Sequence, residues 1–263
     1  MRLSCYERHV GDEADFWART WQERSDEIEA RLGAALDQVV SFSWKPRSRV
    51  PGACALTLPP CDGEGRPRRS EWLFLTLGMS QPSGSDEVRE RRTSGAFHSG
   101  HGYELGVLTQ DAATWPAKLL YELVTYITEP ESVPVGWGHR FAFGFYEVSE
   151  VEQVFVGTVD LVPRGELRGL LVWPYLPTPF FLTSTGRADV LIATGITQPE
   201  WDLAKATSSP HLLLWFTLMG IGQKTDPKRS CLTRDPSAQA TWSRVERMSV
   251  EEVLKQLESA RQL

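Results

Sequence analysis

Three residues whose side chains could do chemistry lie close together in the stretch FHSGHGYELGVLTQ, residues 97–110. His98, His101 and Glu104 follow one another at intervals of three residues. Imidazole nitrogens and carboxylate oxygens are zinc ligands, and the same groups serve as general acids and bases. On a helix, this spacing would bring the three side chains near one face. The stretch therefore defines one hypothesis, a metal-dependent or acid–base enzyme.

The glycines within this stretch argue against a helix. Gly100 and Gly102 fall between the second histidine and its neighbours, and glycine is among the poorest helix formers. In extended backbone the side chains alternate, so His98 and His101 would point to opposite sides. Glu104 would then belong to the polar phase of the strand. We interpret the stretch as a solvated loop that enters a strand, and the metal or acid–base site is the less favoured hypothesis.

The rest of the sequence offers little else for catalysis. It contains no GxSxG, P-loop or HExxH motif and no GxGxxG after a predicted strand. His139 and His211 each stand alone, and we interpret both as structural or surface residues. Cys231 has basic neighbours, which can lower the pKa of a thiol, but no histidine lies within sequence reach. We interpret it as an inert thiol, and we predict no catalytic residue, no metal and no cofactor.

The segment LLVWPYLPTPFFLTS, residues 170–184, combines aromatic side chains with three prolines. Proline fixes φ and removes an N–H donor, so this segment cannot be a regular central strand throughout. A rigid aromatic segment that leaves a strand suits a recognition surface, but such aromatics can also cover the end of a core. The partner-binding residues that we predict are Trp137, Trp173, Tyr175, Phe180 and Phe181.

The composition is that of an acidic globular protein. The chain has 263 residues, 41% of them hydrophobic and 24% charged, and a net charge of −6. This balance disfavours nucleic-acid binding, which needs a basic face, and favours a basic partner. The four cysteines are scattered, and no stretch has the character of a secretory signal or a membrane span. We expect a cytoplasmic protein with reduced thiols that binds neither nucleic acid nor membrane.

Hydrophobic periodicity predicts an α+β fold with a mixed, mostly antiparallel central sheet flanked by helices. Residues 81–95 are expected to form a polar surface excursion, and residues 223–247 to be polar and irregular. The predicted strands are PGACALTLPP, EWLFLTLGMS, residues 103–109, HRFAFGFYEV, EQVFVGTVDL, ELRGLLVWPY and ADVLIATGIT. The last two are the most continuously apolar and are therefore expected at the centre of the sheet.

The helix predictions rest on apolar stripes and on capping residues. The pairs Thr197/Glu200 and Ser249/Glu252 have the spacing of a capping box, which marks a helix start. Helices are predicted over residues 12–40, from Thr114 through residue 127, from Thr197 onward, and over residues 249–262. A further short, apolar helix is predicted in SSPHLLLWFTLMG and ends near Gly220.

Five segments, taken in order, resemble the Suppressor of Fused domain family. They are SEWLFLTLGMSQ, GHGYELGVLTQ, ATWPAKLLYELVTYI, FFLTSTGRADVLIATGITQPEWDLAKA and KTDPKRSCL, and together they span residues 72–232. The resemblance implies an α+β fold around a mixed sheet, protein binding, no enzymatic activity and no cofactor. In animals the domain is the N-terminal part of a regulator that sequesters a transcription factor, whose peptide is held between two lobes.

The resemblance leads to a specific functional hypothesis. About thirty residues follow the matched segments, so we expect no second lobe and do not carry over the two-lobed clamp. Stand-alone bacterial members of the family are proposed immunity proteins that neutralise a cognate toxin by binding it. We therefore expect residues 1–263 to form a single Suppressor-of-Fused-like domain that binds a toxin domain. The alternative is a regulatory or scaffold protein that sequesters a partner peptide at a free sheet edge.

Overall fold

The computed structural model describes most of the chain in several stretches. They are residues 5–32, 39–41, 54–58, 72–82, 84–93, 98–110, 115–127 and 166–260. The predicted strands HRFAFGFYEV and EQVFVGTVDL, together with Trp137, lie outside the described residues.

The described strands form one seven-stranded mixed sheet, in the order β1-β2-β3-β4-β7-β5, with β6 also paired to β7. The pairing of β4 with β7 is parallel, and the remaining pairs are antiparallel. The predicted fold class is therefore confirmed. The strands are β1 (Val39–Ser41), β2 (Cys54–Leu58), β3 (Trp72–Leu75), β4 (His98–Thr109), β5 (Leu167–Pro174), β6 (Phe180–Thr183) and β7 (Gly186–Thr197).

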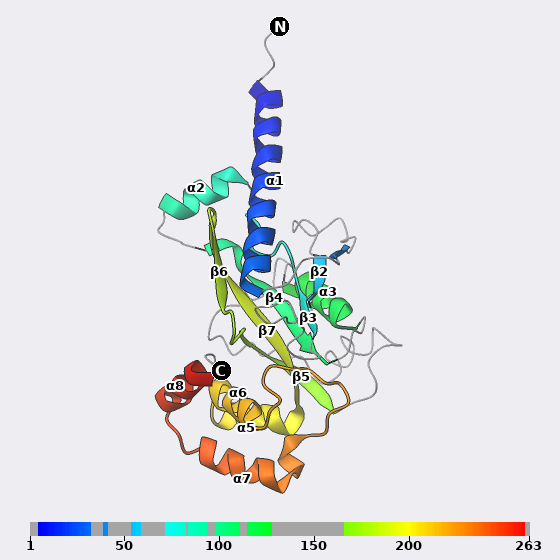
Figure 1. Ribbon diagram of the computed structural model, residues 1–263, viewed down its shortest axis with the longest axis vertical. Helices are drawn as coiled ribbons and strands as arrows, with labels where there is room; N and C mark the ends of the chain where they lie inside the picture. The colour runs from blue at the N-terminus through cyan, green and yellow to red at the C-terminus, as the bar shows by residue number, and fades with distance from the viewer. Residues whose placement is uncertain are drawn as a thin grey trace.

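Helices cover both faces of this sheet and one of its ends (Figure 1). One helix, α1, lies along one face and extends past the sheet, α3 lies on the other face, and α5 to α8 gather at one end. The helices are α1 (Cys5–Leu32), α2 (Ser85–Thr93), α3 (Trp115–Ile127), α5 (Gln198–Ala206), α6 (Ser209–Leu218), α7 (Pro236–Val245) and α8 (Val250–Ala260), with a 3₁₀ turn η1 (Leu232–Arg234).

Strand β7 is the centre of the molecule because both of its faces are buried. Val190 and Ile192 belong to the apolar cluster that includes Ile28 of α1. The intervening Leu191 and Ala193 belong to the cluster that includes the buried stripe of α3. Burial on both faces explains why the sequence here is continuously apolar rather than alternating. The predicted central position is confirmed for β7, whereas β5 ends the strand order of the described residues.

The N-terminal helix begins and ends earlier than residues 12–40, the predicted limits. It covers Cys5–Leu32, and Val39–Ser41 form strand β1, in which Val39 pairs with Leu56 of β2. The apolar residues near position 39 continue the helical periodicity in the sequence, but in the structure they form a strand of the sheet. Tertiary pairing has here overridden a local pattern.

Two polar segments contain helices that the pattern did not predict. Residues 81–95 were expected to be a surface excursion, but Gln81 is buried and Ser85–Thr93 form α2, which buries Val88. The expected irregular stretch 223–247 contains η1 and α7. The spacing of Ala238, Trp242 and Val245, all buried on α7, is a helical signal that was available in the sequence.

The remaining helix predictions are confirmed at their starts. Glu200 closes a capping box on Thr197 at the beginning of α5. At the beginning of α8, the Glu252 carboxylate accepts from the Ser249 N–H at 2.8 Å. These local motifs are reliable because the side chains satisfy N–H groups that no helical carbonyl can reach.

Candidate protein-binding surface and two buried polar networks

The two histidines and the glutamate that raised the metal hypothesis all lie on β4, but in different environments. His98 and His101 are exposed, whereas Glu104 is 0% exposed. Gly100, with φ of +54°, sits where a Cβ atom would lie 2.5 Å from the carbonyl oxygen of Gln81. Within the described ranges, no three histidine, cysteine, aspartate or glutamate side chains are placed to hold a metal ion. The predicted strand over residues 103–109 is confirmed. The interpretation of the residues before it as a loop is wrong, because β4 begins at His98, and Glu104 is buried rather than on a polar face.

The Glu104 carboxylate is surrounded by hydrogen-bond donors from the loop after β3. It accepts from the backbone N–H groups of Gly78 at 3.0 Å, Met79 at 3.2 Å and Ser80 at 3.0 Å. The hydroxyls of Thr76 and Ser80 donate to it at 2.7 and 2.5 Å. A buried carboxylate with this many donors holds the loop in one shape, and it is not a free acid–base group.

Arg24 extends this network to α1. Its guanidinium, which is buried, donates to the hydroxyl of Ser80 at 2.7 Å, to the carbonyl of Ser80 at 2.9 Å, and to the side chain of Gln81. Burial lowers the pKa of Arg24, while the negative charges of Glu104 and Glu23 act in the opposite direction. The network therefore fixes α1 to the loop and the loop to β4.

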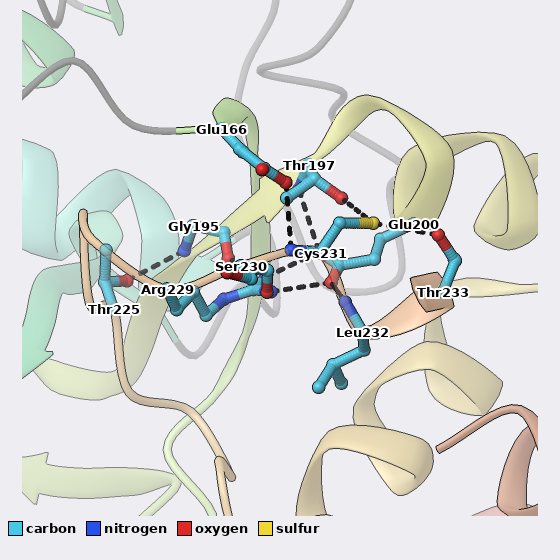
Figure 2. A network of polar contacts seen from close by, with 10 residues as sticks. All are labelled: Glu166, Gly195, Thr197, Glu200, Thr225, Arg229, Ser230, Cys231, Leu232 and Thr233. Carbon is cyan, nitrogen blue, oxygen red and sulfur yellow. Dashed lines mark hydrogen bonds and ion pairs between the residues drawn. The ribbon is translucent and has the colours of Figure 1, made fainter. Parts of the chain in front are cut away.

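A second polar network joins the C-terminal helices to the sheet (Figure 2). Arg229 donates two hydrogen bonds to the two carboxylate oxygens of Glu200, at 2.6 and 2.5 Å. Glu200 also accepts from the N–H groups of Thr197 at 2.8 Å and Leu232 at 3.1 Å. Arg229 reaches the carbonyl of Gly195 at 2.9 Å. A bidentate arginine–carboxylate pair of this kind fixes orientation as well as distance.

Next to this pair, Glu166 and Cys231 hold the same loop (Figure 2). The Cys231 N–H donates to Glu166 at 3.0 Å, and Arg234 donates to its other oxygen at 2.6 Å. These two hydrogen bonds lower the pKa of Glu166. The Cys231 thiol is buried and contacts the hydroxyl of Thr197 at 3.0 Å. The thiol therefore belongs to the packing of the loop, and its interpretation as inert stays a prediction.

Both networks bring together segments that the sequence analysis identified separately. The first joins SEWLFLTLGMSQ to GHGYELGVLTQ, and the second joins the GITQPE stretch to KTDPKRSCL. Their carboxylates already accept several hydrogen bonds from the protein itself, although Arg229 Nε is a buried atom with no partner. These networks are best suited to holding a rigid scaffold.

The proline-rich aromatic segment includes the end of β5, the residues that connect it to β6, and β6 itself. Both strands pair with β7. Strands β5 and β6 pair with successive parts of β7, and residues 175–179 bulge out between them. The Tyr175 N–H still donates to the Val190 carbonyl at 2.7 Å. The side chain of Gln223 accepts from the Leu176 N–H at 2.8 Å and donates to the Pro174 carbonyl at 3.0 Å. The bulge is therefore held on both sides.

The predicted contact residues of this segment divide by burial. Trp173, Tyr175 and Phe180 are half-buried, and Phe181 is 1% exposed in the core beneath α1. Because of this burial, Phe181 offers no surface to a partner in this structure. Whether Trp137, Trp173, Tyr175 and Phe180 contact a partner stays a prediction.

The sequence analysis missed two neighbours of Phe180, the exposed Leu182 and the half-buried Arg187. Leu182 lies two residues further along β6, so it shares a face with Phe180, and it is 52% exposed. The guanidinium of Arg187 stacks 4.1 Å from the centre of the Phe180 ring and pairs with Asp189 at 2.7 Å. We call Phe180, Leu182 and Arg187 the β6 surface. Phe180, Phe181 and Leu182 are all apolar, so the sequence carries no signal that distinguishes the exposed Leu182 from the buried Phe181.

The fold and these features define a class of protein: an α+β domain with a mixed sheet, made rigid by buried polar networks. The chain belongs to the Suppressor of fused protein (SUFU) family, whose model matches residues 57–230. This match confirms the resemblance and begins upstream of residue 72. In eukaryotes the family's domain is a protein-interaction domain. The family is known for proteins that bind and regulate other proteins without catalysing a reaction. No curated protein matches the sequence.

Two solved structures show the same fold at low sequence identity. A Sufu–Fu complex is 16% identical with a TM-score of 0.60, over 85% of this chain and 96% of that one. Drosophila Suppressor of Fused is 17% identical with a TM-score of 0.57, over 86% of this chain but only 54% of that protein. A putative SUFU homologue from Neisseria gonorrhoeae is 13% identical with a TM-score of 0.47, over 81% and 97% of the two chains.

Among the residues that the structure describes, no helix has the length and the hydrophobicity that a membrane crossing requires.

Proposed function

We propose that this protein is a non-catalytic binding domain, and that it acts in the cytoplasm as an immunity protein that neutralises a cognate toxin by direct binding. Its membership of the SUFU family over residues 57–230 carries the proposal, because the eukaryotic domains of this family bind proteins. A solved relative is a complex of Sufu with Fu. The toxin as partner is supported by the resemblance to stand-alone bacterial members of the family.

The β6 surface is the contact that we assign to the partner. It combines an exposed leucine, a half-buried phenylalanine and an arginine stacked on that ring. Aromatic and arginine side chains dominate the energetics of protein interfaces. The neighbouring bulge, with Trp173 and Tyr175, is held by Gln223 and would bind without much further ordering.

The charge of the chain supports the kind of partner. With a net charge of −6, the protein attracts a basic domain at long range. Toxin domains that act on nucleic acids need basic surfaces for the same electrostatic reason. An acidic binding protein would therefore associate rapidly with such a domain and would exclude its substrate.

The test is co-expression with the product of the neighbouring gene. We expect growth protection and a co-purifying complex. Leu182→Asp places a charge on the β6 surface, and we expect it to abolish protection and to weaken binding by about tenfold or more. Leu218→Asp is the matched control, because Leu218 is also an exposed leucine but lies on α6. A protein that neither binds nor protects would overturn the proposal, and equal effects of both variants would overturn the assigned surface.

A scaffold that sequesters a peptide at a sheet edge is the second candidate function. It is favoured by the position of β5, which pairs with β7 on one side and ends the strand order of the described residues. A peptide could add to that edge through backbone hydrogen bonds. Hydrogen exchange would distinguish the two, because strand addition slows exchange along Leu167–Pro174, whereas binding at the β6 surface does not.

A further inference from the structure

A groove of about 550 Å³ opens between α1, α2 and the turn that joins β6 to β7. In Figure 1 these three elements meet at the end of the sheet opposite the C-terminal helices. The groove does not include the residues of the β6 surface. It is lined by Phe16, Ser85, Val88, Arg89, Arg92, Thr93, Ser184 and Thr185.

The lining has the composition of a site for a carboxylate beside an apolar group. Its charged members are Arg89 and Arg92, and no aspartate or glutamate among the residues that the structure describes lines it, in a chain whose net charge is −6. Four further lining residues carry hydroxyls, of which those of Thr93 and Ser184 donate to the Arg89 carbonyl and to Glu23. Phe16 and Val88 supply the apolar part. Two arginines without a lining carboxylate are complementary to a negatively charged ligand.

One wall of the groove is held in place by hydrogen bonds to Ser184. The carboxylate of Glu23 on α1 accepts from the Ser184 N–H at 2.6 Å and from its hydroxyl at 2.5 Å. Arg92 on α2 donates to the Ser184 carbonyl at 2.6 Å. The turn is therefore tied to both helices, and the groove is formed before any ligand arrives. A preformed site loses less conformational freedom on binding.

Both arginines have hydrogen-bonding capacity for a ligand. Arg89 is paired with Asp86, but the two side chains are 77% and 73% exposed, and such a surface pair is weak. An incoming carboxylate can replace Asp86 at little cost. Arg92 uses one N–H for Ser184, and a guanidinium has five. It can keep the turn in place and still pair with a carboxylate.

We propose that this groove binds an acidic segment of a protein partner, in which a carboxylate side chain stands next to an apolar one. The carboxylate pairs with Arg89 and Arg92, and the apolar side chain packs between Phe16 and Val88. The proposal rests on the protein-binding function and not on the identity of the partner as a toxin. The apolar pair and the acidic charge of the chain favour a peptide over nucleic acid.

The experiment is an amide NMR titration of the full chain with two acetylated hexapeptides. One alternates glutamate with leucine, and the other alternates lysine with leucine. We expect saturable shifts at Ser85, Val88, Thr93 and Ser184 with the glutamate peptide only. Arg89→Gln combined with Arg92→Gln should weaken binding by about tenfold or more, equivalent to about 1.4 kcal/mol.

Controls separate this binding from general charge and from loss of fold. Arg244→Gln, on α7 at the far end of the molecule in Figure 1, makes the same change in charge per residue and should leave the titration unchanged. Arg89→Gln alone removes an exposed pair with Asp86 and leaves the Arg92 contact to Ser184 in place, so it reports on binding even if the double variant unfolds. We expect it to weaken binding in the same direction.

Three results would overturn the proposal. They are the absence of saturable shifts, equal shifts with the lysine peptide, and the same shifts from inorganic phosphate at equal concentration, which would make the groove a small-anion site. None of these measurements uses the product of the neighbouring gene. The immunity proposal and the groove can therefore fail independently.

Discussion

The two buried polar networks solve the same physical problem in different ways. Each contains a fully buried glutamate and a buried or nearly buried arginine, and each joins segments distant in the sequence. Glu200 is paired directly with Arg229. Glu104 is instead surrounded by backbone N–H groups and hydroxyls, and Arg24 is joined to it through Ser80.

This difference shows which partner each carboxylate depends on. In the second network one side chain, Arg229, supplies most of the compensation for burying a charge. In the first, the compensation is spread over five donors, and three of them are backbone N–H groups, which only a substitution to proline removes. The second network should therefore be more sensitive to a single change of its arginine.

The largest effect is expected from Arg229→Met. This change leaves Glu200, which is 0% exposed, as an unpaired buried charge. We expect the free energy of unfolding to fall by about 3–5 kcal/mol, as measured by urea denaturation.

Arg234→Met is the matched control for that change. Arg234 pairs with Glu166 at the surface, where the two side chains are 69% and 38% exposed. We expect little change in the urea midpoint. An equal loss of stability in both variants would mean that the buried pair contributes no more than the exposed one, and would contradict the expected sensitivity of the second network.

A smaller effect is expected from Glu104→Gln. The amide keeps one acceptor oxygen, but its NH₂ group then faces the N–H groups that the second carboxylate oxygen accepted from. We expect a loss of about 1–3 kcal/mol in the free energy of unfolding. The amide resonances of Gly78, Met79 and Ser80 should move because their acceptor changes. Glu90→Gln, on the exposed side of α2, is the control.

How much of this could be predicted from the sequence depends on the range of the interaction. The strand β7, the buried stripe of α3 and both capping boxes were predicted, because each is a pattern within about fifteen residues. The short helices α2 and α7 were missed because most of their residues are polar. Only one residue of α2 and three residues of α7 are buried, which gives a weak apolar stripe. Of the β6 surface only Phe180 was predicted. The exposure of Leu182 depends on the packing of distant elements, which the local sequence does not show.

The networks could not be predicted, because their partners are far apart in the chain. Glu104 looked like the polar phase of a strand, and nothing within reach in the sequence shows that residues 76–80 fold around it. The spacing between Glu200 and Arg229 follows no helical or strand period. Only the order of the family segments carried this information, and it did so by resemblance and not by physical derivation.

The smallest effect concerns the exposed edge of the second network, and it appears as a pH dependence. Hydrogen bonds from the Cys231 N–H and from Arg234 lower the pKa of Glu166 in the folded protein. A carboxyl whose pKa is lowered by folding contributes stability above its unfolded pKa, and this contribution is lost as the pH falls through its folded pKa. Glu166→Gln removes the contribution. The variant should therefore be slightly less stable than the wild type near neutral pH and no less stable in acid.

The measurement is the difference between urea midpoints at about pH 7 and about pH 3 for the two proteins. We expect the acid-induced drop to be smaller for Glu166→Gln, and unchanged for Glu246→Gln, an exposed glutamate at the end of α7. A drop equal to that of the wild type would mean that the Glu166 contacts form only part of the time. The loop at Cys231 would then be held by Glu200 and Arg229 alone, which would confine the second network to its buried pair.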